Sequence, residues 1–409
     1  MPAEHGCLII GAGHAADEVA IALRGFGYQA PITIIGEEAH PPYQRPPLSK
    51  TFLAGAHAAA SLYFRDPAVY AKERIEVLTG RTVTSIDPTG RTVTLDRDEV
   101  RRYGTLVIAT GARPRWPAVP GSDLPGLYPV RAIADIEAIR PNVVPGVPIV
   151  LVGAGYIGLE TAAMLQKLGA KVTVLEAMPR VLQRVTAPAV SAFFERMHRE
   201  EGVEIRTGVT VERFAQTTDG LMVHVAGAPA IPAKIVIIGI GVLPNMEMAA
   251  AAGLKTGNGI QVDAYCQTSD ENIYAVGDVA HFESPHYRIS MRLESVQNAK
   301  DMGRVAAAAI AGKPVPYDAL PWFWSDQYDV KLQIAGVSTG YDTVALRGDP
   351  SAGRSFAAFY LKAGEIIAVD AVNRPKEFML GKKLITARKR LSAEVIGDET
   401  FPVMELLGK

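Results

Sequence analysis

The chain has 409 residues, of which 48% are hydrophobic and 21% are charged, and its net charge is −1. This length exceeds what one hydrophobic core usually fills, so we expect two or three domains. The near-neutral charge does not suggest nucleic-acid binding. The most apolar window, residues 235–243, is far shorter than the roughly 20 residues of a membrane helix. The N-terminus also lacks the pattern of a secretion signal, and we therefore expect a cytoplasmic protein.

The two cysteines, Cys7 and Cys266, form no CxxC or CxxxxC pair. This spacing excludes a disulfide framework, a cysteine-ligated iron–sulfur cluster and a redox dithiol. No metal site is predicted, and any redox centre has to be a bound cofactor.

A strand, a glycine turn, an amphipathic helix and a second strand follow one another in residues 6–36. Glycines in the turn let the backbone approach a pyrophosphate, which binds at the helix N-terminus. An acidic residue about 20 positions further on binds the ribose hydroxyls. The residues of this first predicted nucleotide site are Gly11, Gly13, Ala15, Ala16 and Glu37.

The same pattern returns in residues 147–176, with its first glycine 142 positions after that of the first turn. Two such units in one chain predict one site for FAD and one for a nicotinamide. Glu176 ends the second unit, and an acid at this place favours NADH because it repels a 2′-phosphate. Arg180 and Arg184 weaken that preference slightly. The turn residues of this second site are Gly153, Gly155, Tyr156, Ile157 and Gly158.

These patterns predict an α/β fold with two Rossmann-like dinucleotide-binding domains and a C-terminal α+β domain. Proline-rich joints at 113–121 and 140–148 and a change of pattern after residue 320 mark the borders. The last region contains strand-like stretches and a helix-like segment at 377–392. We predict an FAD-binding domain from residues 1–112 and 246–320, an NAD-binding domain from 113–245 and a third domain from 321–409.

Two further strand ends carry the signatures Ala109-Thr110-Gly111 and Gly277-Asp278. With the two glycine turns, they make the chain resemble the FAD-dependent pyridine nucleotide reductases of the glutathione-reductase type. That resemblance implies that Asp278 binds the ribityl chain of the flavin.

The segment YQRPPLSK (43–50) has no cysteine where disulfide reductases and flavin oxidases of this type carry one or two. With ESVQNA (294–299) and PWFWSDQ (321–327), it resembles the bacterial NADH–ferredoxin reductases that serve oxygenases. The resemblance runs from end to end and looks somewhat closer to the reductases of cytochrome P-450 systems. It implies that NADH passes a hydride to FAD, and that electrons then pass singly to a 2Fe–2S ferredoxin.

The resemblance also implies roles for single residues. Lys50 and Glu160 match a pair beside the reacting flavin nitrogen, and Trp324 matches a tryptophan that covers the flavin; these are the candidate catalytic residues. The backbone N–H of Val296 matches a donor to the flavin ring, and Arg131 would neutralise the pyrophosphate. The predicted cofactor-binding set beyond the two turns is Glu37, Arg45, Lys50, Val83, Ala109, Thr110, Gly111, Arg131, Glu160, Glu176, Gly241, Gly277, Asp278 and Val296.

Residues 374–390 contain seven basic residues and one acidic residue. Such a local excess of positive charge suits an acidic ferredoxin that binds transiently. Separately, we expect the protein to be a monomer or a weak homodimer. Three alternatives remain: the reductase of an aromatic-ring dioxygenase, an NADH oxidase, and a non-catalytic flavoprotein that senses NADH.

Overall fold

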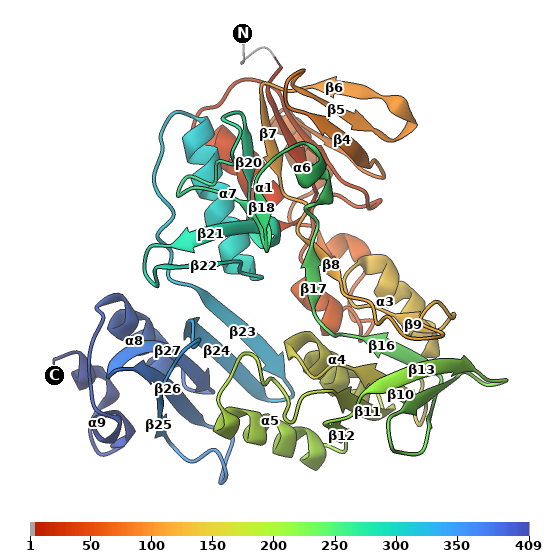
Figure 1. Cartoon of the computed structure of the whole chain (residues 1–409), viewed down its shortest axis with the longest axis vertical. Coiled ribbons are helices and arrows are strands. Elements are labelled where there is room, and N and C mark those ends of the chain that lie inside the picture. The colour runs from red at the N-terminus through yellow and green to blue at the C-terminus, as the bar shows by residue number, and fades with distance from the viewer. Residues whose placement is uncertain (1–4, 409) are drawn as a thin grey trace. The chain divides into compact units, whose positions relative to one another are not determined.

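A computed structural model describes residues 5–408, which divide into two compact units (Figure 1). Unit 1 contains the chain up to Gln44 together with Ala59–Arg113 and Leu243–Pro321. Unit 2 contains Arg45–Ala58, Pro114–Val242 and the chain from Trp322 onward. The segment Arg45–Ala58, which follows the first predicted nucleotide site in sequence, thus groups with unit 2. Two short strands, β8 (Ala112–Pro114) and β17 (Val242–Pro244), lie where the chain passes between the units.

The centre of unit 1 is a parallel five-stranded sheet of order β20-β7-β1-β2-β3. Its strands are short apolar runs because both faces of a parallel sheet are covered. Helices α1 and α7 pack together, and an added Cβ at Gly303 of α7 would lie 3.1 Å from the Ala15 carbonyl oxygen. The bounds are β1 (Cys7–Ile10), α1 (His14–Gly25), β2 (Ile32–Ile35), β3 (Ile75–Leu78), β7 (Thr105–Ile108), β20 (Ile273–Ala275) and α7 (Val296–Ile310).

Two smaller sheets complete unit 1, one of order β4-β5-β6 and one of order β18-β19-β21-β22. They extend the apolar core around the parallel sheet. Their bounds, with the remaining helices, are η3 (Ala59–Leu62), α2 (Pro67–Lys72), β4 (Val83–Asp87), β5 (Thr92–Leu95), η4 (Asp96–Asp98), β6 (Val100–Arg102), α6 (Glu247–Ala251), β18 (Thr256–Gly257), β19 (Gly259–Gln261), η6 (Gly277–Val279), β21 (Ala280–Ser284) and β22 (Ile289–Met291).

Unit 2 contains a second parallel sheet, of order β12-β11-β10-β16-β9, and the antiparallel sheet β13-β14-β15. Residues 211–233 form this antiparallel sheet, and buried positions alternate with half-buried ones along β14. The bounds are η2 (Pro46–Ser49), β9 (Leu127–Tyr128), α3 (Ile133–Ile139), η5 (Arg140–Asn142), β10 (Pro148–Val152), α4 (Tyr156–Lys167), β11 (Lys171–Glu176), α5 (Pro188–Glu200), β12 (Glu204–Thr207), β13 (Val211–Gln216), β14 (Leu221–Val225), β15 (Ile231–Ala233) and β16 (Ile235–Ile238).

The C-terminal part of unit 2 is an antiparallel sheet of order β23-β24-β27-β26-β25, with α8 against β27 (Figure 1). The helix ends earlier than the sequence predicts, because Arg388 has a φ of 49° and the chain then bonds back to the start of β27. The bounds are β23 (Trp322–Gln327), β24 (Val330–Gly336), β25 (Thr343–Arg347), β26 (Phe356–Lys362), β27 (Glu365–Val372), α8 (Pro375–Thr386), α9 (Ala393–Gly397) and η7 (Val403–Leu407).

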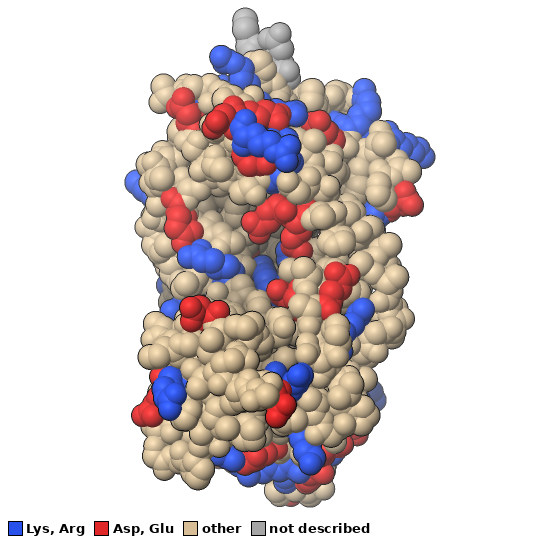
Figure 2. All heavy atoms as spheres, turned by 90° about the vertical axis from the view of Figure 1, so that its right-hand side faces the viewer, with Lys and Arg blue, Asp and Glu red and all other residues tan. Residues whose placement is uncertain are grey.

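Acidic and basic side chains are interspersed on the face of the protein that Figure 2 draws, without a broad field of one sign. This distribution agrees with the net charge of −1. Within residues 5–408, every helix is too short or too polar to cross a membrane.

A buried carboxylate links two parts of unit 2. Asp370 of β27 is 1% exposed, and its Oδ2 accepts hydrogen bonds from the hydroxyls of Thr186, at 2.6 Å, and Tyr360, at 2.5 Å. Burial raises the pKa of Asp370 to about 6, although both hydrogen bonds lower it. Between about pH 4 and pH 6 the native state therefore binds more protons than the unfolded state, and the free energy of unfolding falls as the pH rises.

We predict that Asp370→Asn raises stability at pH 8, because the ionised carboxylate in the wild type costs up to about 3 kcal/mol there. The amide oxygen still accepts both hydroxyls. The difference in thermal unfolding midpoint between variant and wild type should shrink toward pH 4, whereas exposed Asp219→Asn should show no such trend. A variant less stable than the wild type at both pH values would contradict the prediction.

Candidate functional site

The first glycine turn lies close to the backbone of a neighbouring strand. Gly11 follows β1 with a φ of 108°, in the region that favours glycine. A Cβ at this position would lie 2.2 Å from the carbonyl oxygen of Ala109. Because β1 and β7 are adjacent parallel strands, the predicted residues Gly11 and Ala109 meet at one sheet edge.

Open space lies at the N-terminus of α1. Gly13 is the N-cap of this helix, and a Cβ there would meet no atom within 4 Å. Ala15 and Ala16 are buried in the first turn, and a Cβ on Gly277 would lie 3.2 Å from that of Ala15. The glycine before Asp278 thus packs against the turn at which free backbone N–H groups can bind phosphate.

Two further groups of unit 1 suit a long anionic dinucleotide. Glu37 follows the end of β2 and is exposed, and its carboxylate makes no hydrogen bond or ion pair with residues 5–408. Val296 is the first residue of α7, where Ser295 caps only the N–H of Asn298. The open turn, the unpaired carboxylate and this second helix N-terminus fit FAD.

Other predicted residues of the FAD set have structural partners. Thr110 donates to the carbonyl of Asn245 at 2.8 Å and accepts from its side chain at 2.9 Å. Gly111 has a φ of 63°, and the Val83 side chain is buried in the core. In unit 2, Arg45 donates to the carbonyl of Arg131 at 2.5 Å. Cofactor contacts at these positions stay predictions.

The second glycine turn repeats the geometry of the first in unit 2. Gly153 has a φ of 107°, and its Cβ would lie 2.3 Å from the Gly239 oxygen. Gly158 packs on the turn itself, since its Cβ would lie 2.3 Å from the Gly153 oxygen. Gly155 caps α4 and faces open space, and Ile157 is 48% exposed. The turn therefore leaves room for a second pyrophosphate.

Glu176 ends β11 and is bound to the backbone of this turn. One carboxylate oxygen accepts the N–H of Ala154 and the other accepts the N–H of Met178, both at 2.8 Å. Glu176 therefore shapes the glycine turn, a role that the sequence does not show.

The two arginines near Glu176 differ in what they contact. The Arg180 guanidinium donates to the carbonyls of Thr186 and Gln183 and to Ser191. Arg184 is exposed and lies near Gly241, whose φ is 105°. Arg180 is thus bound within its own loop, whereas Arg184 is exposed. The effect of both arginines on the NADH preference stays a prediction.

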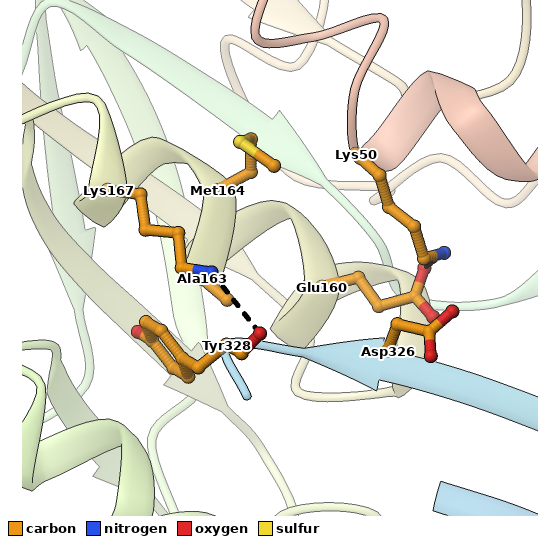
Figure 3. A pocket seen from close by; sticks show the side chains of 7 residues that line it. All are labelled: Lys50, Glu160, Ala163, Met164, Lys167, Asp326 and Tyr328. Carbon is orange, nitrogen blue, oxygen red and sulfur yellow. Dashed lines mark hydrogen bonds and ion pairs between the residues drawn. The ribbon is translucent and has the colours of Figure 1, made fainter. Parts of the chain in front are cut away.

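Lys50 and Glu160 form a close ion pair in unit 2, at 2.5 Å between Nζ and Oε2 (Figure 3). Ser49 also donates to Oε2, and Ser325 of β23 donates to Oε1, both at 2.7 Å. The side chain of Glu160 is 5% exposed and that of Lys50 is 19% exposed. A buried carboxylate needs such donors. Sequence reasoning missed both serines, because they are distant from Glu160 along the chain.

The segment that carries Lys50 is held by neighbours in unit 2. Its two prolines begin the short 3-10 helix η2, because proline fixes φ near the helical value. The Arg140 guanidinium lies 4.0 Å from the centre of the Phe52 ring and donates to the Phe52 carbonyl. Beside the pair is a pocket of about 140 Å³, lined by Lys50, Glu160, Ala163, Met164, Lys167, Asp326 and Tyr328 (Figure 3).

Trp324 belongs to an aromatic group on β23. Its ring centre lies 5.6 Å from that of Trp322 and 6.4 Å from that of Phe323. Phe323 in turn lies 5.0 Å from Tyr156, at the start of α4. Burial, and secondarily the charge of Asp370, raises the pKa of Tyr156 well above its usual value, so its hydroxyl stays neutral.

Two family models match the chain. The pyridine nucleotide-disulphide oxidoreductase model matches residues 5–303, and the reductase C-terminal model matches residues 322–407. The second match coincides with the sheet β23–β27 and its helices.

The chain is 43% identical to putidaredoxin reductase from Pseudomonas putida, over 100% of this chain and 98% of that protein. The crystal structure of the covalent putidaredoxin reductase–putidaredoxin complex superposes with a TM-score of 0.95, covering 99% of this chain and 98% of the other. The ferredoxin reductase for the CYP199A2 system from Rhodopseudomonas palustris is 41% identical, with a TM-score of 0.94 and coverage of 98% and 99%. The chain therefore belongs to the pyridine nucleotide-disulphide oxidoreductase family and, within it, to the ferredoxin reductases that carry this C-terminal domain.

Proposed function

We propose that the chain is an NADH-dependent ferredoxin reductase that binds FAD and delivers electrons to a 2Fe–2S ferredoxin. The observation that carries this proposal is the similarity over the whole chain to a reductase that was crystallised with its ferredoxin. The two glycine turns with open helix N-termini supply sites for two dinucleotides.

Each dinucleotide has its own set of groups. The turn at Gly11–Ala16 and the Glu37 carboxylate bind the pyrophosphate and ribose of FAD. The turn at Gly153–Gly158 binds the pyrophosphate of NADH, and Glu176 accepts its ribose hydroxyls. Bound FAD supplies the chemistry that the side chains lack, since it takes a two-electron hydride and releases electrons singly.

The protein has no thiol that could relay electrons. Residues 43–50 lack cysteine, and Cys7 and Cys266 are both buried. Burial also raises the pKa of Cys7 to about 12, so this thiol stays protonated. Electrons must therefore leave directly from the flavin. By the family resemblance, Lys50 and Glu160 supply fixed charges beside it and Trp324 covers it.

The ferredoxin is proposed to feed a cytochrome P-450, as expected from the sequence resemblance and from the likeness to the reductase of the CYP199A2 system. An aromatic-ring dioxygenase is the alternative terminal acceptor. A cytoplasmic location agrees with the use of NADH and with two unpaired cysteines.

We predict that NADH oxidation with cytochrome c as final acceptor rises at least about tenfold when a 2Fe–2S ferredoxin is added. A rival NADH oxidase would consume oxygen at a comparable rate without ferredoxin. A non-catalytic flavoprotein would turn over slowly with either acceptor. The measurement is steady-state NADH consumption with oxygen uptake recorded in parallel.

We predict that Glu176→Ala raises the KM for NADH about tenfold, because it removes the ribose acceptor and frees the N–H of Ala154. The flavin content should not change. The KM of Glu176→Gln for NADH should lie between those of Glu176→Ala and the wild type, since an amide oxygen can still accept a hydrogen bond. KM values and FAD absorbance provide the test, with exposed Glu212→Ala as the control. Loss of FAD from the Ala variant would show that the two sites are assigned the wrong way round.

The positive surface for the ferredoxin is narrower than the basic run 374–390. Arg374 pairs with Glu377 and Glu399 and is therefore partly neutralised. Lys376, Met379 and Lys383 are exposed and lie three and four residues apart on α8, so they share one helix face. Met379 is 54% exposed. An apolar centre between two lysines suits an acidic partner with a small apolar contact.

We predict that Lys376→Gln with Lys383→Gln lowers kcat/KM for ferredoxin about five- to tenfold at low salt, and flattens its dependence on ionic strength. Reduction of ferricyanide by NADH should not change, because that acceptor needs no docking surface. The matched control replaces two exposed lysines elsewhere in unit 2, Lys171 and Lys234. An equal loss in the control would assign the effect to net charge and not to α8.

A further inference from the structure

A chain of buried hydrogen bonds leads away from Glu160. Ser325 donates to Oε1 of Glu160 at 2.7 Å and accepts from Nε2 of Gln327 at 3.1 Å. The other end of the Gln327 amide, Oε1, lies 2.8 Å from Nε2 of His198 on α5. Ser325 and Gln327 are 1% exposed, and His198 is 0% exposed. Water therefore has little access to these bonds.

The donors and acceptors of these groups allow only one direction of donation along the hydrogen-bond chain. An ionised carboxylate only accepts, so the Ser325 hydroxyl donates to it and must accept from the Gln327 amide nitrogen. The Gln327 oxygen then requires a proton on Nε2 of His198. This assignment of the tautomer follows from the network. Three donors in a row point toward Glu160, and bonds aligned in this way strengthen one another.

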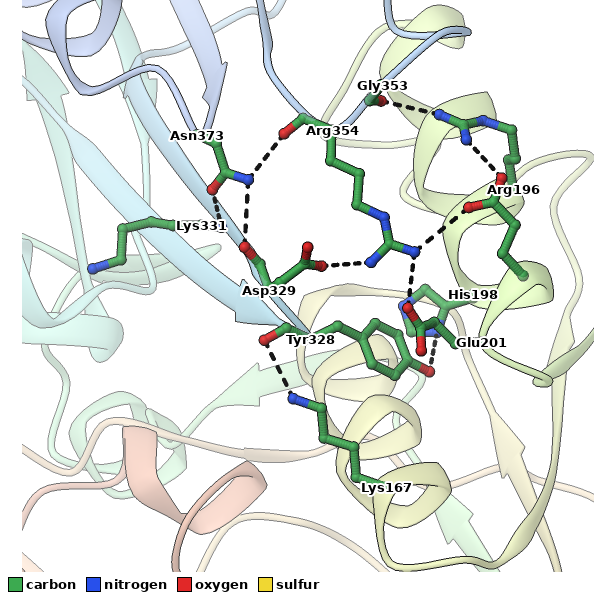
Figure 4. Close-up of polar contacts among 11 residues, drawn as sticks. Lys167, Arg196, His198, Glu201, Tyr328, Asp329, Lys331, Gly353, Arg354 and Asn373 are labelled. Atoms are coloured by element: carbon green, nitrogen blue, oxygen red, sulfur yellow. Dashed lines mark hydrogen bonds and ion pairs between the residues drawn. The ribbon is translucent and has the colours of Figure 1, made fainter.

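The hydrogen-bond chain from Glu160 reaches a β-hairpin whose turn is strained. Gln327 ends β23, and the next residue, Tyr328, has a φ of 56°, which is unusual for a bulky side chain. Lys167 donates to the Tyr328 carbonyl at 3.3 Å, and the His198 ring lies 5.1 Å from the Tyr328 ring (Figure 4).

Asp329, the second turn residue, pairs with Arg354 at 2.5 Å, and Arg354 also binds Glu201 of the α5 C-terminus at 2.8 Å (Figure 4). The hydrogen bond from Arg354 lowers the pKa of Asp329, so this carboxylate remains ionised and paired. These contacts therefore join the turn that follows Gln327 to the C-terminus of α5, the helix that carries His198.

We propose that Ser325, Gln327 and His198 are positioning residues that hold Glu160 as an oriented anion. Lys50 and Ser49 occupy one carboxylate oxygen, and the donor chain occupies the other. This inference rests on the proposed function, in which Glu160 serves the flavin, and it adds three residues that act through Glu160.

Other charged groups face this network. Lys50, Asp326, Lys167 and Tyr328 line the pocket with Glu160. Tyr328 and Glu201 face His198. Burial lowers the pKa of His198 to about 4, so the imidazole is neutral in the pH range of the test and does not add a charge to the chain. The donor from Ser325 and the donors from Lys50 and Ser49 all point toward the carboxylate of Glu160.

The test uses two variants that break the chain at different bonds. Ser325→Ala removes the donor to Oε1. Gln327→Glu keeps the size of the side chain and the acceptor for His198, but it replaces the nitrogen that donates to Ser325 with an oxygen. Gln333→Glu, on the neighbouring strand β24, makes the same chemical change at a residue outside the chain.

Flavin reduction by NADH is measured in single turnovers of the FAD-loaded protein between about pH 5 and pH 9. We expect Ser325→Ala and Gln327→Glu each to slow flavin reduction about tenfold near neutral pH. Each should also move the acidic limb of the plot of rate against pH upward by about one pH unit. The Kd for NADH should stay within about twofold. The double variant should lose no more than the slower single variant, because both changes break one chain.

A second readout does not use the flavin. Nitrogen NMR of the His198 imidazole, assigned with His198→Gln, should show a neutral ring protonated at Nε2 in the wild type. In Gln327→Glu the ring should take up a proton closer to neutral pH, because the new carboxylate faces it. A ring protonated at Nδ1 in the wild type would overturn the proposed direction.

A normal rate and an unchanged acidic limb in Ser325→Ala would overturn the proposal, even if Gln327→Glu fails to fold. Gln333→Glu should behave as the wild type, and an equal effect there would show a general charge effect instead. Ferredoxin-dependent cytochrome c reduction by the wild type is measured alongside. Its absence would refute the proposed function, whereas the pH profile of flavin reduction would still decide the role of the chain.

Discussion

The buried carboxylate of Glu160 is the constraint on which the arrangement of unit 2 depends. A charge that is 5% exposed is stable only if hydrogen bonds replace the lost water. Its donors are Lys50 and Ser49, which lie in the segment Arg45–Ala58, and Ser325, which lies on β23. Three distant parts of the chain must therefore meet at α4. The contacts of Lys50 and Ser49 with Glu160 are among those that join Arg45–Ala58 to unit 2.

The two nucleotide turns depend on a more local constraint. Gly11 and Gly153 each adopt a positive φ and lie so close to a neighbouring carbonyl that no Cβ fits. Gly13 and Gly155 face open space at helix N-termini. The same backbone geometry thus serves both units, and the acid at the end of the next strand differentiates them. Glu37 is unpaired within the described residues, whereas Glu176 holds the amide of its own turn.

Charged residues show how far local sequence and final role can differ. The sequence does not show which groups Arg180, Arg354 and Arg374 bind. In the structure, Arg180 binds two backbone carbonyls, Arg354 joins a turn to α5, and Arg374 pairs with two carboxylates. Arg374 is thus partly neutralised, whereas Lys376 and Lys383 are exposed on one face of α8, and Arg388 and Arg390 are exposed after it.

The sequence by itself determined the two nucleotide turns, their strands and helices, and the lack of a thiol relay. These features depend on residues close together in the chain, such as Gly153 and Gly158, whose backbone needs are nearly independent of context. Only the folded chain shows which donors hold Glu160, which of the two arginines that follow Glu176 in sequence is exposed, and where α8 ends. Those outcomes depend on contacts such as Ser325 with Glu160, across 165 residues of chain, and no local pattern encodes the register that brings such residues together.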